Sequence, residues 1–542
     1  MTLDTVLLLY PEIVVLLVAT WTYVGGAFAT RESARWNWFA LGGLAVAALQ
    51  LYRQLEPTVF TDQVSTFGPM TADALMYLAR FVALAVGAVF VLATMRSTPR
   101  GQSGEIVGSI LMVVAGMMLV AGATELVTLF LALELISIPT YVILYLGRRG
   151  AGGDEAVTKY FFLSILSSAV MLYGFSFLYG LSGAGGLAAS TKLADIRASL
   201  VAAEAAGTLS PLASVAFVLV LAGLAFKLAA VPFHFYAPDV YHGTSSVNAG
   251  LLAVAPKIAG LIALVRLLFA MPGVESLALA VISAVALLTM TLGNVMALWQ
   301  ANVRRMLAYS SIAHGGYLLI GLVVALHRPD DPTAQSGLAA ALLYAVVYSV
   351  ASAGAFAALA YLARGTREVE TLDDLAGIGR SQPGVAALLA VFMFSLAGIP
   401  PLVGFWGKLA IFTGPLDVYL ASLPSDGAVV ADSALALGQW YLALAVIGVL
   451  NAAVAAAYYL RIVAAMYFRP AIDDAEPQGG LGALAAATLC GLAVVAGGIF
   501  PGVGLKYAQS AGRAALAPSS EPPIEATAHA VRGVSRLPTP DR

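Results

Sequence analysis

Long apolar stretches dominate the sequence, and short polar segments separate them. A helix needs about 20 residues to cross the hydrocarbon core of a membrane, which is roughly 30 Å thick. Fourteen stretches approach or exceed this length, and none shows the apolar/polar alternation of a barrel strand. Because helices satisfy their own backbone hydrogen bonds in lipid, the pattern predicts an all-α polytopic membrane protein with about 14 transmembrane helices. The stretches lie near residues 5–26, 36–53, 73–95, 105–122, 124–146, 157–182, 212–235, 246–270, 275–298, 303–326, 337–363, 382–415, 436–468 and 481–504.

Prolines interrupt some of these stretches. The twelfth and thirteenth are too long for one straight helix, and Pro400 and Pro401 lie inside the twelfth. Proline removes a backbone donor and clashes with the preceding turn, so we expect a break there. Pro232 and Pro256 accompany lysines in the seventh and eighth stretches. Interrupted helices with ionisable residues in two halves of a chain are typical of inverted repeats with ion sites at the midplane. We therefore expect two inverted five-helix repeats with broken helices.

Basic residues in the connections predict the orientation in the membrane. Most of them follow odd-numbered stretches, as Arg148, Arg304 and Arg305 do. By the positive-inside rule these connections are cytoplasmic, and both termini lie outside the inner (plasma) membrane of the cell. The expected organisation is N-terminal transmembrane helices at 1–104, a first repeat at 105–270, a second repeat at 275–470, the last transmembrane helix at 471–505, and a disordered extracytoplasmic tail at 506–542.

Composition excludes several classes of protein. Hydrophobic residues make up 60% of the chain and charged residues 11%, and an ordinary soluble domain does not have this balance. A net charge of -2 gives no general affinity for nucleic acid. The single cysteine, Cys490, excludes an intrachain disulfide, an all-cysteine metal site and an iron–sulfur cluster held by this chain.

Three of the six lysines lie inside apolar stretches: Lys227, Lys257 and Lys408. Placing one Lys near the centre of a membrane helix costs about 2.5 to 3.5 kcal/mol, so three without a function are unexpected. Most arginines lie in connections or near the ends of stretches. Arginine keeps its proton at any accessible pH, whereas a desolvated lysine can release it. The choice of lysine indicates titrating groups, and a static, paired strut is the alternative for any one of them.

One carboxylate and two histidines extend this set. Glu134 lies about ten residues into the fifth stretch, near the midplane, and is the expected partner of a buried lysine. Separating such a pair would favour release of the lysine's proton. His314 lies about eleven residues into its stretch, and we favour a relay role for it. For His234, two turns after Lys227, relay and packing roles both stay open. Neither histidine has metal-site spacing, so we predict no metal.

Four motifs in the correct order resemble a known family. They are "LALELISIPTYVILYL", "FKLAAVPFHFYAPDVYHGTSSVNAGLLAVAPKIAGL", "VRRMLAYSSIAHGGYLLIGL" and "GIPPLVGFWGKLAIF". Together they are similar to the antiporter-like membrane subunits of proton-pumping NADH:quinone oxidoreductase, respiratory complex I, and most of all to subunit N. The resemblance runs from about residue 105 to 470. The segment "HGTSSVNAG" departs from it, since relatives commonly carry Ala and Pro there.

The resemblance implies roles for the buried residues. Glu134 and Lys227 would form a coupling pair, Lys257 and His314 would continue a hydrophilic axis, and Lys408 would end it. It also implies that NADH, FMN, the iron–sulfur clusters and quinone are bound by partner subunits, with no cofactor in this chain. The expected partners are the other membrane subunits of complex I and the lipid bilayer, with no nucleic acid.

Three functions remain open at this point. The first is a proton-translocating subunit that couples electron transfer from NADH to quinone to proton pumping, with no redox chemistry of its own. The second is a subunit of an Na⁺ or K⁺/proton antiporter, or of a membrane hydrogenase with related helices. An antiporter would need carboxylates and hydroxyls near Lys227 to coordinate a metal cation, and the sequence offers mainly Glu134. The third is a structural scaffold, against which the buried lysines argue.

Overall fold

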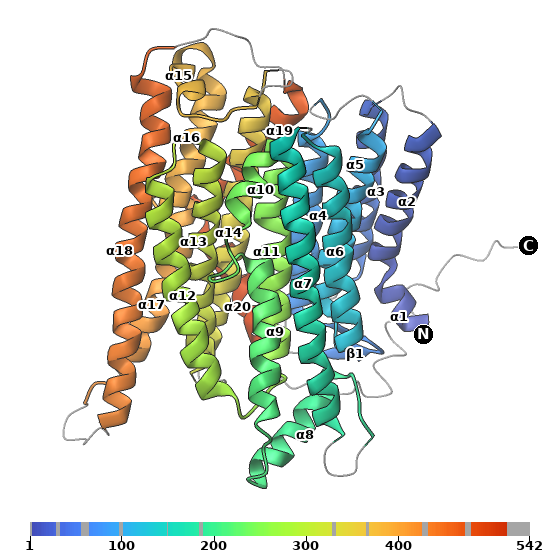
Figure 1. Cartoon of the computed structure of the whole chain (residues 1–542), viewed down its shortest axis with the longest axis vertical. Helices are drawn as coiled ribbons and strands as arrows, with labels where there is room; N and C mark the ends of the chain where they lie inside the picture. Colours follow the sequence, from blue (N-terminus) through green and yellow to red (C-terminus); the bar gives the residue numbers. More distant parts are fainter. Residues whose placement is uncertain are drawn as a thin grey trace, which may run out of the picture.

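The structure is a bundle of long helices whose axes are nearly aligned (Figure 1). This computed structural model describes residues 3–28, 33–55, 64–96, 101–148, 150–183, 188–327, 332–364, 368–424, 432–471 and 479–516. In the view of Figure 1, α2 and α3 lie on one side of the bundle and α18 lies on the other. α15 lies at the upper end of the bundle and α8 at the lower end.

Helices account for nearly all of the regular structure. A short antiparallel hairpin, β1 (Ser65–Phe67) and β2 (Met70–Ala72), is the exception in the described part of the chain. The helices are α1 (Leu3–Leu8), α2 (Tyr10–Phe28), α3 (Ser33–Arg53), α4 (Ala74–Ala93), α5 (Ser103–Gly122), α6 (Leu126–Leu146), α7 (Ala151–Ser182), α8 (Leu193–Ala205), α9 (Leu212–Leu228), α10 (Ala237–Gly243), α11 (Ser246–Leu268), α12 (Glu275–Leu298), α13 (Val303–Ala325), α14 (Pro332–Leu362), the 3₁₀ turn η1 (Asp373–Leu375), α15 (Ile378–Ser381), α16 (Pro383–Ala397), α17 (Val403–Ala421), α18 (Asp432–Phe468), α19 (Gly480–Ile499) and α20 (Pro501–Leu516).

Eleven helices in the described residues are long and apolar enough to cross a membrane. They are α2, α4, α5, α6, α7, α11, α12, α13, α14, α18 and α19. Two shorter apolar helices, α9 and α16, accompany them. The prediction of an all-α polytopic membrane protein is therefore confirmed.

Side-chain caps fix where three of the central helices begin. Asp73 accepts a hydrogen bond from the backbone of Met76 at the start of α4 (2.8 Å), and Asn302 accepts one from Arg305 at the start of α13 (3.0 Å). Ser245 caps α11 in the same way. These bonds satisfy donors that have no partner within the helix.

Two of the expected crossings are interrupted. α9 ends at Leu228, where Ala229 adopts a left-handed conformation (φ 53°), and α10 begins only at Ala237. α16 ends at Ala397, where Gly398 is also left-handed (φ 91°), and α17 begins at Val403. The break in the twelfth stretch therefore falls at Pro400 and Pro401, as the sequence predicts.

Other expectations about helix continuity are wrong. α18 is one helix of 37 residues, although the sequence stretch appeared too long for one straight helix. It contains no proline to end it, and a long helix can tilt or extend beyond the hydrocarbon core. Pro256 lies inside α11 without ending it. Tyr348 of α14 donates a hydrogen bond to the Ala253 carbonyl near this proline (3.2 Å), and such bonds let membrane helices tolerate proline.

The tail expected from residue 506 also differs from the prediction. Residues 506–516 belong to α20, a helix that packs against α14 and α4. Its buried face consists of small residues, including Ala508, Ala511 and Ala514, which let neighbouring helices approach closely. Residues 517–542, the rest of the expected tail, lie outside the described residues.

The centre of the bundle is formed by α11 and α13. Every residue of α11 except Arg266, and every residue of α13 except Arg305, is buried. These two helices carry Lys257 and His314. The fold therefore places ionisable groups inside the bundle and away from the lipid-facing surface.

Candidate functional site

Lys227 of α9 contacts α6, the helix that carries Glu134. The Lys227 ammonium donates a hydrogen bond to the Ser137 hydroxyl, one turn after Glu134. Glu134 Oε1 accepts a hydrogen bond from Ser168 Oγ of α7 (2.5 Å). Glu134 therefore lies one helical turn from the serine that binds Lys227, and Ser137 is the group in direct contact with the ammonium.

The end of α9 lies closely against α11 and α13. A Cβ atom at Gly260 of α11 would lie 3.1 Å from Lys227 Cβ. A Cβ atom at Gly315 of α13 would lie 3.1 Å from the Leu228 carbonyl oxygen and 3.8 Å from Lys257 Nζ. The two glycines therefore bring the surroundings of Lys227 and Lys257 together.

Lys257 is held by α13 and α14. Its ammonium donates to the Ser311 backbone carbonyl and to Ser311 Oγ, the latter at 2.8 Å. Tyr348 donates from its hydroxyl to the same Ser311 Oγ (2.7 Å), and its ring centroid lies 5.0 Å from Lys257 Nζ. A ring face at this distance attracts an ammonium group.

His314 connects two tyrosines. Its Nδ1 pairs with the Tyr344 hydroxyl (2.5 Å) and its Nε2 with the Tyr459 hydroxyl (2.8 Å). The Tyr459 hydroxyl also pairs with Ser310. A neutral imidazole donates from one nitrogen and accepts at the other, so His314 can pass a proton between its two tyrosines by changing tautomer.

Lys408 uses the break between α16 and α17. Its Nζ donates to the carbonyl oxygen of Ala397, the last residue of α16, at 2.9 Å. The last carbonyls of a helix have no partner within it and carry partial negative charge. The Tyr317 ring centroid lies 5.3 Å from Lys408 Nζ. The break therefore supplies a backbone acceptor for a buried ammonium group.

The three lysines share one property. Lys227, Lys257 and Lys408 are 4%, 2% and 5% exposed, and none forms an ion pair in the described part of the chain. Their direct hydrogen-bond partners are neutral hydroxyl and carbonyl groups. No direct ion pair therefore holds any of them in the protonated form, and the nearby Glu134 carboxylate bonds to Ser168 and not to Lys227.

His234 does not join this arrangement. It lies in the break between α9 and α10, and its Nδ1 is buried with no hydrogen-bond partner among the described contacts. No described hydrogen bond or ring contact links it to the lysines or to His314. The structure thus brings together five of the six predicted residues and leaves His234 apart.

Sequence reasoning missed the tyrosines and serines that hold the predicted groups. Tyr344 and Tyr348 are four residues apart on α14, so they share one face of the helix. Ser137 and Ser311 lie in helices that carry a predicted residue. Polar side chains at helical spacing in a buried stretch were the available signal, but the sequence does not show which face is turned toward a lysine.

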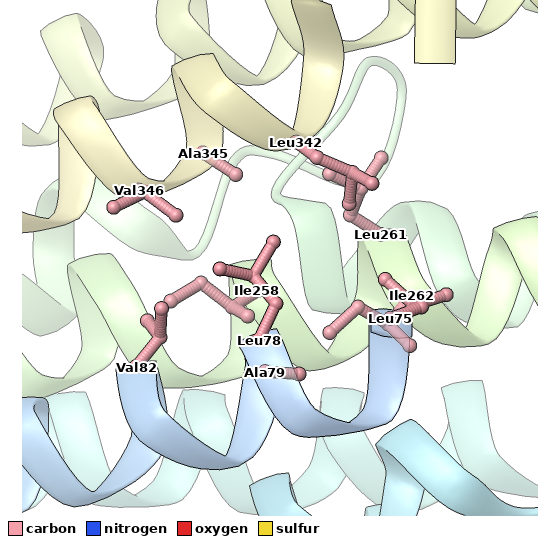
Figure 2. Close-up of a pocket in the computed structure, with 10 residues that line it drawn as sticks. All are labelled: Leu75, Leu78, Ala79, Val82, Ile258, Leu261, Ile262, Leu342, Ala345 and Val346. Carbon is pink, nitrogen blue, oxygen red and sulfur yellow. The ribbon is translucent and has the colours of Figure 1, made fainter. Parts of the chain in front are cut away.

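A cavity between α4, α11 and α14 lies beside the lysine-bearing α11 (Figure 2). Its volume is about 20 Å³, and its lining consists of Leu, Ile, Val and Ala side chains, among them Ile258 and Leu261. A water molecule needs polar partners as well as space. This side of α11 therefore offers a water molecule no polar side chain, and the polar groups described above lie elsewhere in the bundle.

A cluster of charged residues surrounds α10. Asp239 accepts hydrogen bonds from Lys159 of α7 (2.6 Å) and from Arg305 of α13 (2.7 Å). Burial alone raises the pKa of Asp239, but these two hydrogen bonds outweigh it and hold that pKa below its usual range. For His242, burial and the nearby Arg304 lower the pKa. Asp239 therefore joins α7, α10 and α13 as a carboxylate at neutral pH.

Among the described residues, no three His, Cys, Asp or Glu side chains lie together as a metal site would require.

Comparison with known proteins identifies the family. The family model described as NADH:quinone oxidoreductase/Mrp antiporter, TM, matches residues 123–429. NADH-quinone oxidoreductase subunit N 1 from Koribacter versatilis (strain Ellin345) is 36% identical over 483 residues, which cover 87% of this chain and 88% of the relative. The chain belongs to the subunit N family of NADH-quinone oxidoreductase. Another member, from Trichlorobacter lovleyi, is 34% identical over 506 residues and covers 92% of this chain and 96% of its own.

Solved structures agree with membership in the subunit N family. A chain of respiratory complex I from Thermus thermophilus with bound aureothin has a TM-score of 0.71 and 28% identity, covering 91% of this chain and 98% of its own. A chain of the Mrp complex from Dietzia sp. DQ12-45-1b has a TM-score of 0.77 at 21% identity, covering 95% of this chain and 100% of its own. At that identity the second likeness shows a shared fold alone.

Proposed function

We propose that this chain is the proton-translocating subunit N of a respiratory complex I and that its buried lysines carry the protons. The observation that supports this most is the setting of Lys227, Lys257 and Lys408, which are buried and bound by neutral groups. Because no ion pair fixes their charge, each can exist with or without its proton. A static strut would instead be expected to pair with a carboxylate.

The proposed path begins at the cytoplasmic side. A proton loads Lys227, which Glu134 favours electrostatically from its place beside Ser137. A change of charge or hydration in the neighbouring subunit then breaks the Glu134–Lys227 pair, so that Glu134 no longer favours the protonated lysine. The proton then moves by way of Lys257 and His314 toward Lys408 and leaves on the outer side.

Water molecules or side-chain rotations must carry the proton across the intervals between these groups. Ser311 and Tyr348 border Lys257, and Tyr344 and Tyr459 border His314. Hydroxyl groups can both accept and donate a proton, so they suit the intervals between the lysines. Redox chemistry lies outside this path: NADH, FMN, the iron–sulfur clusters and quinone belong to partner subunits, and this chain contributes no cofactor.

The proposal includes the architecture expected from the sequence. Fourteen crossings result if α3, α9 with the break that follows it, and the broken pair α16 and α17 are added to the eleven apolar helices. Inverted repeats at 105–270 and 275–470 are supported by the two similar breaks, each preceded by a left-handed residue. Both termini lie outside the cell's inner membrane, because the basic connections lie on the cytoplasmic side. Partner membrane subunits and lipid surround the chain.

The alternative, a cation/proton antiporter subunit, receives less support. An antiporter would need several oxygen groups near Lys227 to replace the hydration shell of Na⁺ or K⁺. The surroundings of Lys227 offer Glu134, Ser137 and Ser168 in the described contacts. One carboxylate and two hydroxyls fall short of a complete cation site.

The test replaces Lys227 with Met in the assembled complex. We expect proton uptake by vesicles and NADH-driven quinone reduction to fall together, because electron transfer cannot proceed past a blocked pump. Lys192→Met is the matched control, since Lys192 is exposed and lies outside the path, and it should retain both activities. The amount of assembled complex is measured for each variant. If Lys227→Met keeps both activities near the wild-type level, Lys227 is a structural strut and the path is wrong.

A further inference from the structure

A second cluster of buried polar groups lies beside the end of the proposed path. Asn294 of α12 is fully buried, and its side chain contacts Tyr317 of α13 and two residues of α18, Asn451 and Tyr458. A buried amide in a membrane helix is costly unless its donors and acceptor are satisfied. The proposed proton path gives Asn294 no role.

Each polar atom of the Asn294 amide is used. Its Nδ2 donates to the Tyr317 hydroxyl (3.0 Å) and to Asn451 Oδ1 (3.2 Å). Its Oδ1 accepts from the Tyr458 hydroxyl (3.0 Å). Asn451 is itself fixed, because its Nδ2 donates to the Ile447 carbonyl (3.0 Å) and to Thr291 (3.2 Å). The amide is therefore held in one orientation by α18.

The Tyr317 ring links this amide to the path. Its hydroxyl end is bound by Asn294, and its face lies toward Lys408, with Nζ 5.3 Å from the ring centroid. The same ring makes an edge contact with His314, at 5.8 Å between centroids. The hydroxyl oxygen of a tyrosine lies on the axis of its second side-chain torsion, so anchoring it fixes where the ring lies, while the flanking Tyr344 and Phe412 rings, at 6.2 and 5.9 Å between centroids, restrict the rotation of the ring plane.

We propose that Asn294 is a positioning residue for Lys408. It anchors the Tyr317 hydroxyl and so holds the ring where its face lies under the Lys408 ammonium group and where it makes a T-shaped contact with His314. Asn451 and Tyr458 hold Asn294 in turn, so the packing of α18 on α12 sets the surroundings of the last lysine. This inference rests on the proposed function, because it concerns how Lys408 accepts and releases protons there.

The experiment compares four variants in the assembled complex: Asn294→Leu, Tyr317→Phe, the double variant of these two, and Tyr317→Leu. NADH-driven proton pumping is measured in vesicles across a pH series. Loss of a desolvated ring contact to a cation is expected to slow pumping by roughly tenfold. Tyr317→Leu removes the ring and should have the largest effect, whereas Asn294→Leu and Tyr317→Phe each remove only the anchor.

The double variant distinguishes positioning from general packing. If Asn294 acts through the Tyr317 hydroxyl, adding Asn294→Leu to Tyr317→Phe changes the rate by less than about twofold, and both single variants share one altered pH profile. If the two effects multiply, or if Asn294→Leu keeps the wild-type profile, the proposal is overturned. Should Asn294→Leu fail to assemble, Tyr317→Phe removes the same hydrogen bond, and an unchanged profile for it also overturns the proposal.

Two further variants complete the design. Asn37→Leu is the matched control, because Asn37 is a fully buried amide of α3 that bonds to Val91 of α4 and to Thr94, the residue that follows α4. Its pH profile should equal that of the wild type. Lys408→Met separates the two proposals. If it leaves pumping intact, the proposed path fails; if it abolishes pumping while Asn294→Leu does not alter it, the path stands and the positioning role fails.

Discussion

Neutral partners distinguish the lysines of the path from two arginines that lie inside or at the edge of the bundle. Arg80 and Arg266 form ion pairs with Glu12 and Asp73, at 2.6 Å in each case, whereas Lys257 is bound by Ser311 and a tyrosine ring. A buried ion pair keeps its charges because breaking it leaves an uncompensated ion. Arginine with a carboxylate suits a fixed structural role, and lysine among hydroxyls suits a group that changes its charge.

Ser311 provides a test at the scale of one residue. Its Oγ accepts from both Lys257 and Tyr348, while its backbone carbonyl gives Lys257 a second acceptor. Ser311→Ala removes the shared hydroxyl and keeps the carbonyl. We expect pumping to fall by roughly tenfold, the value of one hydrogen bond to a charged group, and by less than in Lys257→Met.

The measurement is vesicle proton uptake per NADH oxidised. Ser167→Ala is a suitable control, because the Ser167 hydroxyl donates to the Gly223 carbonyl within the same bundle and contacts no residue of the proposed path. Equal losses in the two serine variants would mean that any buried hydroxyl matters for packing, and the role of Ser311 beside Lys257 would be refuted.

Among the structural elements, helix breaks were the most predictable feature and helix faces the least. Two adjacent prolines end a helix by local chemistry, so the gap at 398–402 could be expected from the sequence. Pro256 obeys the same chemistry, but α11 continues through it, and Tyr348 of α14 donates a hydrogen bond to the Ala253 carbonyl in the turn before it. That contact depends on tertiary packing, and no local pattern encodes it.

The candidate site also contains some residues that the sequence alone reveals and others that only the tertiary packing reveals. Buried lysines, Glu134 and His314 stand out because charged or titratable side chains are rare in apolar stretches. Asn294 and the tyrosines do not stand out, since tyrosine is common in membrane helices and one amide has many explanations. Only the packing of α12, α13 and α18 shows that Asn294 and Tyr317 are in contact with each other.

Asp239 gives a test at the scale of the elements, because it joins α10 to α7 and α13. Its folded-state pKa is held below the usual range, so the stability from these bonds is present above the unfolded pKa, about 4, and is lost as the pH falls through the folded pKa. We expect Asp239→Asn to lower stability by about 1 kcal/mol at neutral pH, since partial exposure weakens both bonds.

Melting of the purified complex, followed across pH, checks this prediction. The wild type should lose its advantage over Asp239→Asn as the solution becomes strongly acidic. Glu155→Gln serves for comparison, because Glu155 pairs with Lys159 (2.5 Å) but is 59% exposed, and such pairs contribute little. A difference between wild type and Asp239→Asn that stays constant with pH would argue against the carboxylate's role.

For the whole molecule, ion pairs join the N-terminal helices to the rest of the bundle. Arg80 of α4 pairs with Glu12 of α2, and Arg266 of α11 pairs with Asp73 at the start of α4. Arg266 also donates to the Ala121 carbonyl at the end of α5 (2.8 Å). These contacts therefore join α2, α4 and α5 to the lysine-bearing α11.

The Arg80–Glu12 pair can be tested by removing one partner and then both. The two side chains are 0% and 1% exposed, and breaking such a pair costs about 3 to 5 kcal/mol because one charge remains buried alone. Arg80→Leu or Glu12→Leu alone should therefore reduce the amount of assembled complex in membranes. The double variant leaves no charge behind, so apolar packing can replace the pair, and assembly should recover. Quinone reduction per assembled complex should match the wild type, because the pair lies outside the proposed proton path. If the double variant is as poorly assembled as the single ones, the pair contributes through its specific geometry, and the electrostatic account of how α2 is held against α4 is wrong.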